Sequence, residues 1–121
     1  MKTLIILAHG SRREESNQEI KELAKKVKAL AGSNYDLLDY AYLEVVAPSL
    51  PEAIDSCIDK GASNITVFPY FLNSGNHVKR DIPEMVETAK EKYPDCSFKI
   101  SACIGMIDEM PDLILRQALS L

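Results

Sequence analysis

The stretch TLIILAHGSRREESNQEIKELAKKVKAL, residues 3–30, changes its hydrophobic pattern partway along. The run TLIILA indicates a buried strand, and the residues after it place apolar side chains at helical spacing, namely Ile20, Leu23, Ala24, Val27 and Leu30. Ser11 or Ser16 is available to cap this helix. A buried strand followed at once by an amphipathic helix is the unit from which parallel α/β domains are built.

The same unit is predicted three more times along the chain. Strands are expected in YDLLDYAYLE (35–44), NITVFPYFL (64–72) and SFKISACIG (97–105), and helices at 47–61, 78–93 and 110–121. We expect Gly61 to cap the second helix, Pro83 to lie in the first turn of the third and Pro111 at the start of the fourth. The pattern predicts one three-layer α/β domain over residues 1–121. Its four-stranded parallel sheet would be covered on both faces and have flavodoxin-like topology.

Composition excludes several classes of protein. The chain has 121 residues, and 14 Lys and Arg against 18 Asp and Glu give a formal charge of −4, which argues against a general nucleic-acid binder. TLIILA is too short to span a membrane, so we expect a cytoplasmic protein without a membrane partner. The three cysteines, Cys57, Cys96 and Cys103, contain no C-x-x-C spacing and are expected to be ordinary buried or half-buried thiols.

Both histidines of the chain fall in loops that leave one edge of the predicted sheet. Ligands of parallel sheets bind beyond the carboxyl ends of the strands, and the loops there begin near His9, Glu44, Asn73 and Cys103. Imidazole binds divalent metals and takes up protons near neutrality. His9 and His77 are too few for a tight structural site, which favours an exchangeable metal. Glu44 is the third candidate, as a metal ligand, a proton carrier or a contact to substrate.

Glycines and cations accompany these histidines. Gly10 and Gly75 would let a ligand approach the backbone closely, but neither segment matches a nucleotide-binding motif. Each histidine is followed by two cations, Arg12 and Arg13 in one case and Lys79 and Arg80 in the other. Cations at a helix start oppose the helix dipole, so they indicate either an anionic ligand or simply solvated helix residues.

Three segments, LAHGSR, AYLE...PSLPEAI and VFPYFLNSGNHVKRDIP, together resemble the small CbiX-type sirohydrochlorin chelatases. The resemblance implies a chelatase-like fold and a lyase that inserts cobalt or nickel, with iron as a further option, into sirohydrochlorin without ATP. It places the chain in cobalamin or nickel-tetrapyrrole biosynthesis, the latter serving methanogenesis. The metal would be a substrate, no cofactor would be permanently bound, and the protein would be a homodimer.

The resemblance also implies roles for individual residues. His9 would be metal ligand and proton acceptor, His77 the other metal ligand, and Glu44 an assisting acid that touches substrate. The tetrapyrrole pocket would be lined by Phe71, Leu72, Asn73, Ser74, Gly75 and Asn76. Ala47 stands where some relatives carry an acid, so any contact there would be through shape or backbone. The four cations would bind the carboxylates of the macrocycle.

Two other functions remain open. HGSR is similar to the signature of histidine phosphatases, although Ala8 stands where that signature has arginine. A metal or tetrapyrrole carrier would use the same histidines without catalysing insertion.

Overall fold

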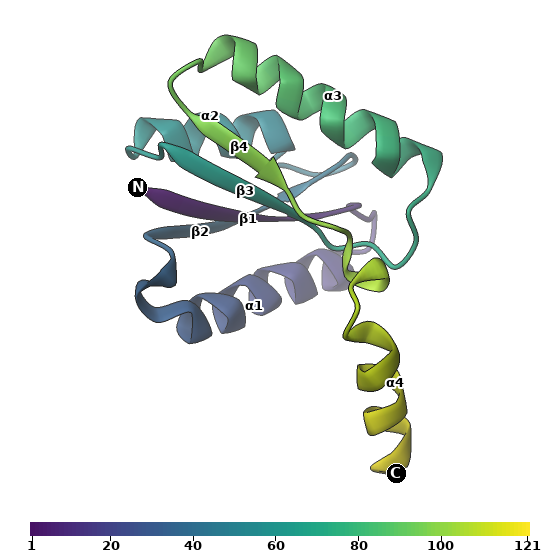
Figure 1. Ribbon diagram of the computed structural model, residues 1–121. Helices are drawn as coiled ribbons and strands as arrows, with labels where there is room; N and C mark the ends of the chain where they lie inside the picture. The colour runs from purple at the N-terminus through teal and green to yellow at the C-terminus, as the bar shows by residue number, and fades with distance from the viewer.

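The computed structural model describes the backbone of residues 1–121 and every side chain except those of Asn76 and His77. Four parallel strands form one sheet in the order β2-β1-β3-β4 (Figure 1). They are β1 (Lys2–Ala8), β2 (Leu37–Tyr42), β3 (Asn64–Pro69) and β4 (Ser97–Ile100). The α-helices are α1 (Glu14–Ala31), α2 (Leu50–Asp59), α3 (Asn76–Lys92) and α4 (Met110–Leu119), and two short 3₁₀ helices are η1 (Gly32–Asn34) and η2 (Ile104–Met106). The predicted α/β class and flavodoxin-like strand order are confirmed.

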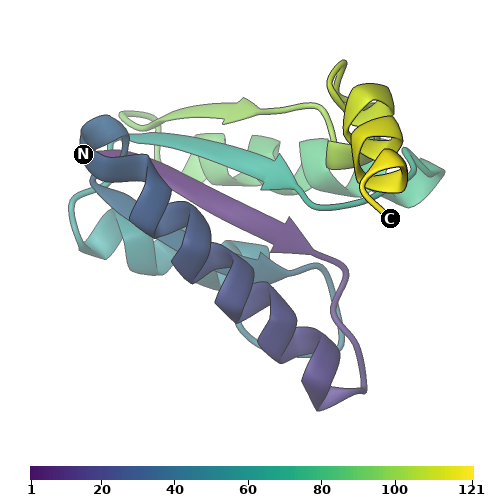
Figure 2. The same ribbon diagram turned by 90° about the horizontal axis from the view of Figure 1, so that it is seen from below.

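The core lies between the sheet and the helices α2 and α3. Ile5 and Leu7 of β1 are fully buried there, and so are Ile65 and Val67 of β3. Burying an aliphatic side chain of this size contributes about 1.5–3 kcal/mol. Helix α1 lies on the opposite face, against β1 and β2 (Figure 2). The chain order reverses between β1 and β3, which places the switch point of the sheet at the end of β1.

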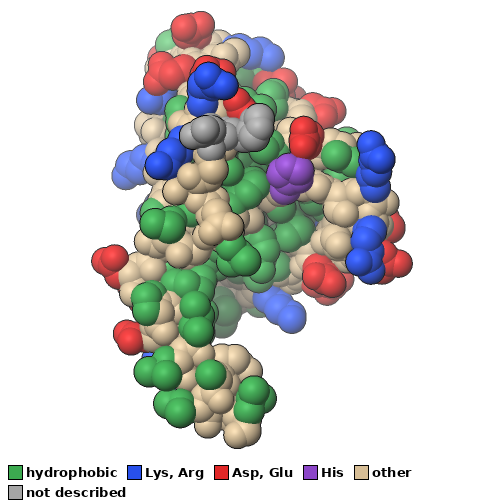
Figure 3. All heavy atoms as spheres, turned by 90° about the vertical axis from the view of Figure 1, so that its right-hand side faces the viewer, with side chains coloured by type: hydrophobic (Ala, Val, Ile, Leu, Met, Phe, Trp, Pro, Cys, Tyr) green, Lys and Arg blue, Asp and Glu red, His purple; other side chains and the backbone are tan. Residues whose placement is uncertain are grey.

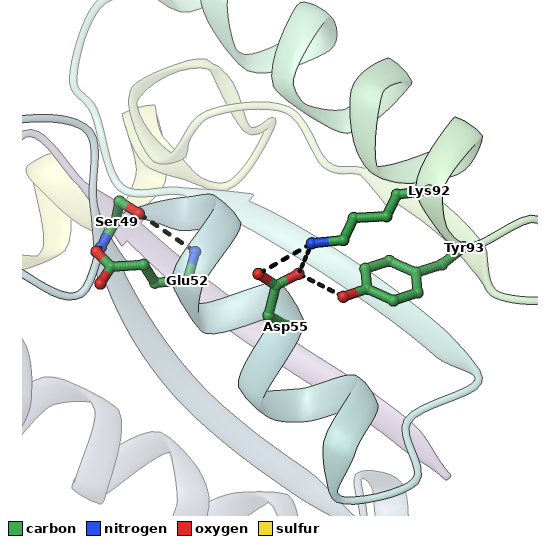
Figure 4. A network of polar contacts seen from close by, with 5 residues as sticks. All are labelled: Ser49, Glu52, Asp55, Lys92 and Tyr93. Atoms are coloured by element: carbon green, nitrogen blue, oxygen red, sulfur yellow. Dashed lines mark hydrogen bonds and ion pairs between the residues drawn. The ribbon is translucent and has the colours of Figure 1, made fainter.

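Polar contacts join α2 to its own first turn and to α3 (Figure 4). Ser49 Oγ accepts from Glu52 N at 3.2 Å and Ser49 N donates to Glu52 Oε1 at 2.9 Å, a capping box that lowers the pKa of Glu52. Asp55 accepts a hydrogen bond from the Tyr93 hydroxyl and pairs with Lys92 at 3.2 Å. The Tyr93 bond and then Lys92 lower the pKa of Asp55. Helices α2 and α3 are thereby fastened together on one face.

Two predictions about helix ends are corrected, and a third is confirmed. Arg13 is the N-cap of α1 and no side chain caps it; the Ser11 hydroxyl instead accepts from Arg13 N at 3.0 Å, and Ser16 already lies inside the helix. Pro83 lies in the interior of α3, not in its first turn, because the helix begins as early as Asn76. The prediction for Gly61 is confirmed: it follows the C-cap residue Lys60 at φ 105°, its N donates to Ile58 O at 2.9 Å, and the next residue, Ala62, donates from N to Cys57 O at 2.9 Å.

The predicted closing helix exists, but it does not cover the sheet. After β4 the chain forms η2, and α4 then projects from the body of the domain (Figures 1 and 2). On the α1 side, β3 and β4 carry no helix (Figure 2). Strand β3 accordingly alternates buried Ile65 and Val67 with half-buried Thr66 and Phe68. Helices α2 and α3 cover one face of the sheet, as expected. On the other face α1 covers β1 and β2, so the expectation fails over β3 and β4.

Candidate functional site

The loops after β1 and β2 run side by side beyond the sheet. Leu43 N donates to Ala8 O at 2.8 Å and Glu44 N donates to His9 O at 3.1 Å, so the pairing of the two strands continues past their ends. This continuation brings His9 Nε2 within 3.0 Å of Glu44 Oε1. The two side chains stay open to solvent, with 60% and 61% of their surfaces exposed. Two of the predicted site residues therefore form a pair.

Both ring nitrogens of His9 face oxygen atoms. Nδ1 lies 3.0 Å from the carbonyl oxygen of Gly10, and Nε2 faces Glu44. A neutral imidazole has one N–H and one lone pair, so it can donate to only one of these oxygens at a time. A ring that donates from Nδ1 to Gly10 presents the Nε2 lone pair toward Glu44. A proton that arrives at Nε2 finds a carboxylate within hydrogen-bond distance.

Glu44 is held in place through its backbone. Gly10 adopts φ 94° and lies so close that a Cβ atom there would be 2.1 Å from Glu44 O. On the other side, Val46 N donates to Glu44 O at 2.9 Å and Val45 has φ 76°. These two features define a γ-turn of the rare, more strained form, in which the central residue has positive φ. A cis peptide joins Ala47 to the proline that follows it. The position of Glu44 is thus set from two sides.

A buried polar cluster supports the loop that carries His9. Asn17 is only 4% exposed, yet its Oδ1 accepts from Ser11 N at 3.0 Å and its Nδ2 donates to Ser11 O at 2.8 Å. The Tyr42 hydroxyl donates to Asn17 O at 2.7 Å, and burial, followed by the charges of Tyr40 and Glu14, raises the pKa of Tyr42. The sequence analysis missed Asn17. The available signal was its place three residues before Ile20, on the apolar face of the helix.

The loop after β3 completes the site on a third side. The Phe71 ring meets the His9 ring edge-on, with centroids 6.4 Å apart, and Leu72 is 72% exposed. Gly105 of η2 supports this loop: its N donates to Phe71 O at 3.0 Å, and a Cβ atom on Gly105 would lie 1.7 Å from Leu72 O. Asn73 and Gly75 are exposed and Ser74 is half-buried. The predictions for the side chains of Asn76 and His77 lie outside the described residues.

A cavity of about 280 Å³ opens beside the His9–Glu44 pair. Leu43 lines it from β2, and Asp81 and Met85 line it from α3. Neither α3 residue was predicted, although Asp81 follows His77 by four positions, the spacing of one helix face. Among the side chains that the structure describes, no three His, Cys, Asp or Glu gather in a way that could hold a metal ion.

The surface at the carboxyl ends of the strands, where the cavity lies, is exposed to solvent (Figure 3). A histidine, acidic side chains and hydrophobic side chains lie together on it, and the hydrophobic side chains continue onto the projecting part of the molecule. The predicted cations Arg12, Arg13, Lys79 and Arg80 are exposed, and so is Ala47. Arg13 Nε is 3.9 Å from Glu15 Oε2. The four cations are exposed to solvent, and their contacts with a substrate stay a prediction.

The cysteines behave as expected. Cys57 and Cys103 are buried, Cys96 is half-buried and all three are free thiols. Burial raises the pKa of Cys57 to about 11, which keeps it protonated and inert. Among the helices described, none combines the length and apolarity that a membrane span requires.

The fold is shared with known chelatases. The whole chain superposes with a TM-score of 0.83 on the sirohydrochlorin chelatase SirB from Bacillus subtilis subspecies spizizenii in complex with cobalt, at 27% identity, and covers 51% of that chain. It also superposes with a TM-score of 0.78 on a putative cobalamin biosynthesis CbiX protein from Marinobacter aquaeolei, at 26% identity, covering 98% of this chain and 93% of the other. The CbiX family model matches residues 3–121, and the chain belongs to this family.

Curated relatives show the same family at the level of sequence. A chloroplastic sirohydrochlorin ferrochelatase from Arabidopsis thaliana is 34% identical over 92% of this chain and 48% of the relative. A sirohydrochlorin cobaltochelatase from Methanococcus maripaludis is 38% identical over 71% of this chain and 58% of the relative. The chain thus spans about half to three fifths of the length of these relatives.

Proposed function

We propose that this chain inserts a divalent metal ion into sirohydrochlorin. The observation that carries the proposal is the His9–Glu44 pair, 3.0 Å apart beside an open cavity and next to Phe71. Relatives named for different metals share sirohydrochlorin in their names, which supports the substrate more strongly than the metal. We propose cobalt or nickel, with iron as a third option, because imidazole accepts all three.

Metal insertion requires that two inner nitrogens of the macrocycle lose their protons. We assign metal binding and proton uptake to His9 Nε2, in that order, because one lone pair cannot serve both at once. As the ion passes to the macrocycle, the freed Nε2 accepts a proton and Glu44 receives or stabilises it. The second metal ligand in this proposal is His77.

Apolar side chains and cations suit a flat, anionic macrocycle. Phe71 and Leu72 offer apolar surface beside His9, and the rest of the same loop, Asn73 to Asn76, would border the ring. Arg12, Arg13, Lys79 and Arg80 would bind carboxylates at its rim, where attraction acts at short range despite the negative total charge. Ala47 would contact it by shape alone.

A second copy of the chain would close the site. His9 and Glu44 are about 60% exposed, so a single lobe covers only one side of a bound macrocycle. Longer relatives carry roughly a second lobe's length of additional chain. We therefore propose a homodimer, and a cytoplasmic location stays a prediction from the sequence.

The test follows the absorption of sirohydrochlorin after addition of Co²⁺, Ni²⁺ or Fe²⁺. His9→Ala and His77→Ala should each slow insertion by about 10²-fold or more, the usual contribution of a positioned acid–base group. Glu44→Gln should slow it by a smaller factor, and Glu87→Gln, an exposed glutamate of α3 paired with Lys90, is the matched control. Insertion at the wild-type rate in both histidine variants would show the proposal to be wrong.

The same experiment tests the carrier alternative. A carrier would bind the metal and sirohydrochlorin, yet the two would combine no faster than in buffer. Membership of the CbiX family argues against the histidine-phosphatase alternative.

A further inference from the structure

Helix α4 exposes apolar side chains that a folded domain normally covers. Leu113 is 51% exposed, Ile114 62%, Leu115 59% and Leu119 76%. The helix packs chiefly against η2, and among the α-helices that the structure describes it is the one that does not lie on the sheet (Figure 1). Several large apolar side chains gathered on one exposed helix mark an interaction site. We call residues 110–119 the arm.

The start of the arm is anchored at the carboxyl edge of the sheet. Gly105 of η2 is hydrogen-bonded to Phe71 O and in close contact with Leu72 O. Only three residues separate η2 from α4, and Met110 N closes this turn by donating to Ile107 O at 3.1 Å. From this fixed point the arm leaves the domain on the α1 side without lying along β3 or β4 (Figure 2).

A groove lies on the α1 side of the domain, and no helix that the structure describes in this chain covers it. It has a volume of about 650 Å³ and is lined by residues of α1, including Glu15, Glu19 and Leu23, and by Tyr70 after β3. The neighbouring face of β3 leaves Phe68 half-buried and Tyr70 39% exposed. Parallel sheets are normally covered on both faces, so this half-face calls for one more helix. We call this surface the α1 groove.

We propose that the arm of one copy lies in the α1 groove of a second copy, and the reverse, so that two arms are exchanged across a two-fold axis. This inference rests on the homodimer of the proposed function and names the elements that form it. The arm offers leucines, isoleucine and Arg116, and the groove offers the apolar Leu23 and Tyr70 within a lining that is mostly acidic and also holds Lys26, so Arg116 has carboxylates to pair with. An isologous exchange of this type is a common route to dimers.

The size of the contact suits a stable dimer. The four exposed apolar side chains, each with roughly 100 Å² exposed, would bury up to about 400 Å² on each arm. With two arms and the two grooves that receive them, the total is at most about 1,600 Å², within the standard range of specific interfaces.

Sedimentation tests the arm. The double variant Ile114→Glu, Leu115→Glu should raise the dimer dissociation constant by at least about 100-fold while the melting temperature of the monomer's core is kept, since α4 lies outside that core. Leu30→Glu, at the far end of α1 and 85% exposed, is the matched control and should remain dimeric. A variant that stays dimeric with both arm residues changed would overturn the proposal.

Cross-linking tests the groove. In a Cys96→Ser background, one chain carries Gln117→Cys on the arm and the other carries Gln18→Cys in the groove; oxidation of the mixture should yield a disulfide between chains. Thr88→Cys on α3 replaces Gln18→Cys as the control and should not react. If the two cysteines placed in one chain instead form an internal disulfide at high dilution, or no disulfide forms in the mixed dimer, the arm does not lie in the partner's groove.

Neither experiment contains metal or tetrapyrrole. A failure of the arm proposal therefore leaves the insertion assay intact, and a failure of the insertion assay leaves the assembly result standing.

Discussion

Two glycines near the predicted histidines should respond very differently to the same substitution. Gly10→Ala places a methyl group 2.1 Å from Glu44 O, in a backbone conformation of φ 94° that alanine rarely adopts. Gly75 has φ −71°, and apart from its chain neighbours no described atom lies within 4 Å of an added Cβ. The pair thus separates the effect of a clash from that of losing a glycine beside the site.

The structure allows the size of the effect to be worked out. The left-handed conformation costs alanine about 1–2 kcal/mol. Parting the two loops to relieve the overlap adds about 1–3 kcal/mol, the usual cost of overpacking. We expect Gly10→Ala to lose about 2–4 kcal/mol of unfolding free energy. Gly75→Ala should cost less, about 1 kcal/mol or below, because Gly75 is the N-cap of α3, where alanine is less favourable than glycine.

Urea unfolding is the direct assay. With a slope of about 1.5–2 kcal/mol per M, Gly10→Ala should lower the midpoint by about 1–2.5 M. Because the same contact places Glu44 beside His9, sirohydrochlorin metallation should also slow at temperatures where the variant is folded. Midpoints for Gly10→Ala and Gly75→Ala that agree with each other and with wild type would refute the reasoning.

Three further outcomes follow from contacts around the site and in the core. Val45→Gly should leave the unfolding free energy unchanged or raise it by up to about 1 kcal/mol, because it relieves the positive φ. The same change should slow metal insertion, because Glu44 loses its fixed turn. Val45→Ala, which keeps the strain, is the control, and faster insertion by Val45→Gly would contradict the reasoning. Asp55→Asn should lower the melting temperature at pH 7, because the folded-state pKa of Asp55 lies below its unfolded value. This stabilisation is present above the unfolded pKa of about 4 and is lost as the pH falls through the folded value. The melting temperatures of wild type and variant should therefore converge toward pH 3. Gly105→Ala should destabilise the protein by about 2 kcal/mol or more in the same urea assay and slow insertion, because its Cβ atom would meet Leu72 O at 1.7 Å.

The parts of the fold that follow from periodicity were predictable. All four strands and all four α-helices lie within or close to the predicted ranges, because buried strands and amphipathic helices show their burial in the residue pattern. That His9 and Glu44 lie at one edge of the sheet followed from the rule that the carboxyl ends of parallel strands share one edge, whereas their direct contact was not predicted. That rule needs only strand directions, which the βα alternation supplies.

Features that depend on contacts between distant segments were not predictable. Asp81 lines the cavity only because α3 lies beside the ends of β1 and β2, and Gly105 supports Leu72 only because η2 returns beneath the β3 loop. The course of α4 was missed for a similar reason. Its apolar pattern shows that it needs a partner surface, but the pattern does not say whether that surface belongs to the same chain.

The contact between Gly105 and Leu72 joins two regions that the chain could have kept independent. The segment that precedes α4 contacts the Phe71–Leu72 loop, so a displacement of the helix would also move the aromatic ring beside His9. A dimer formed through α4 would therefore link assembly to the shape of the edge that carries His9. In a dimer formed through α4, the neighbour would tune the site without supplying a single ligand.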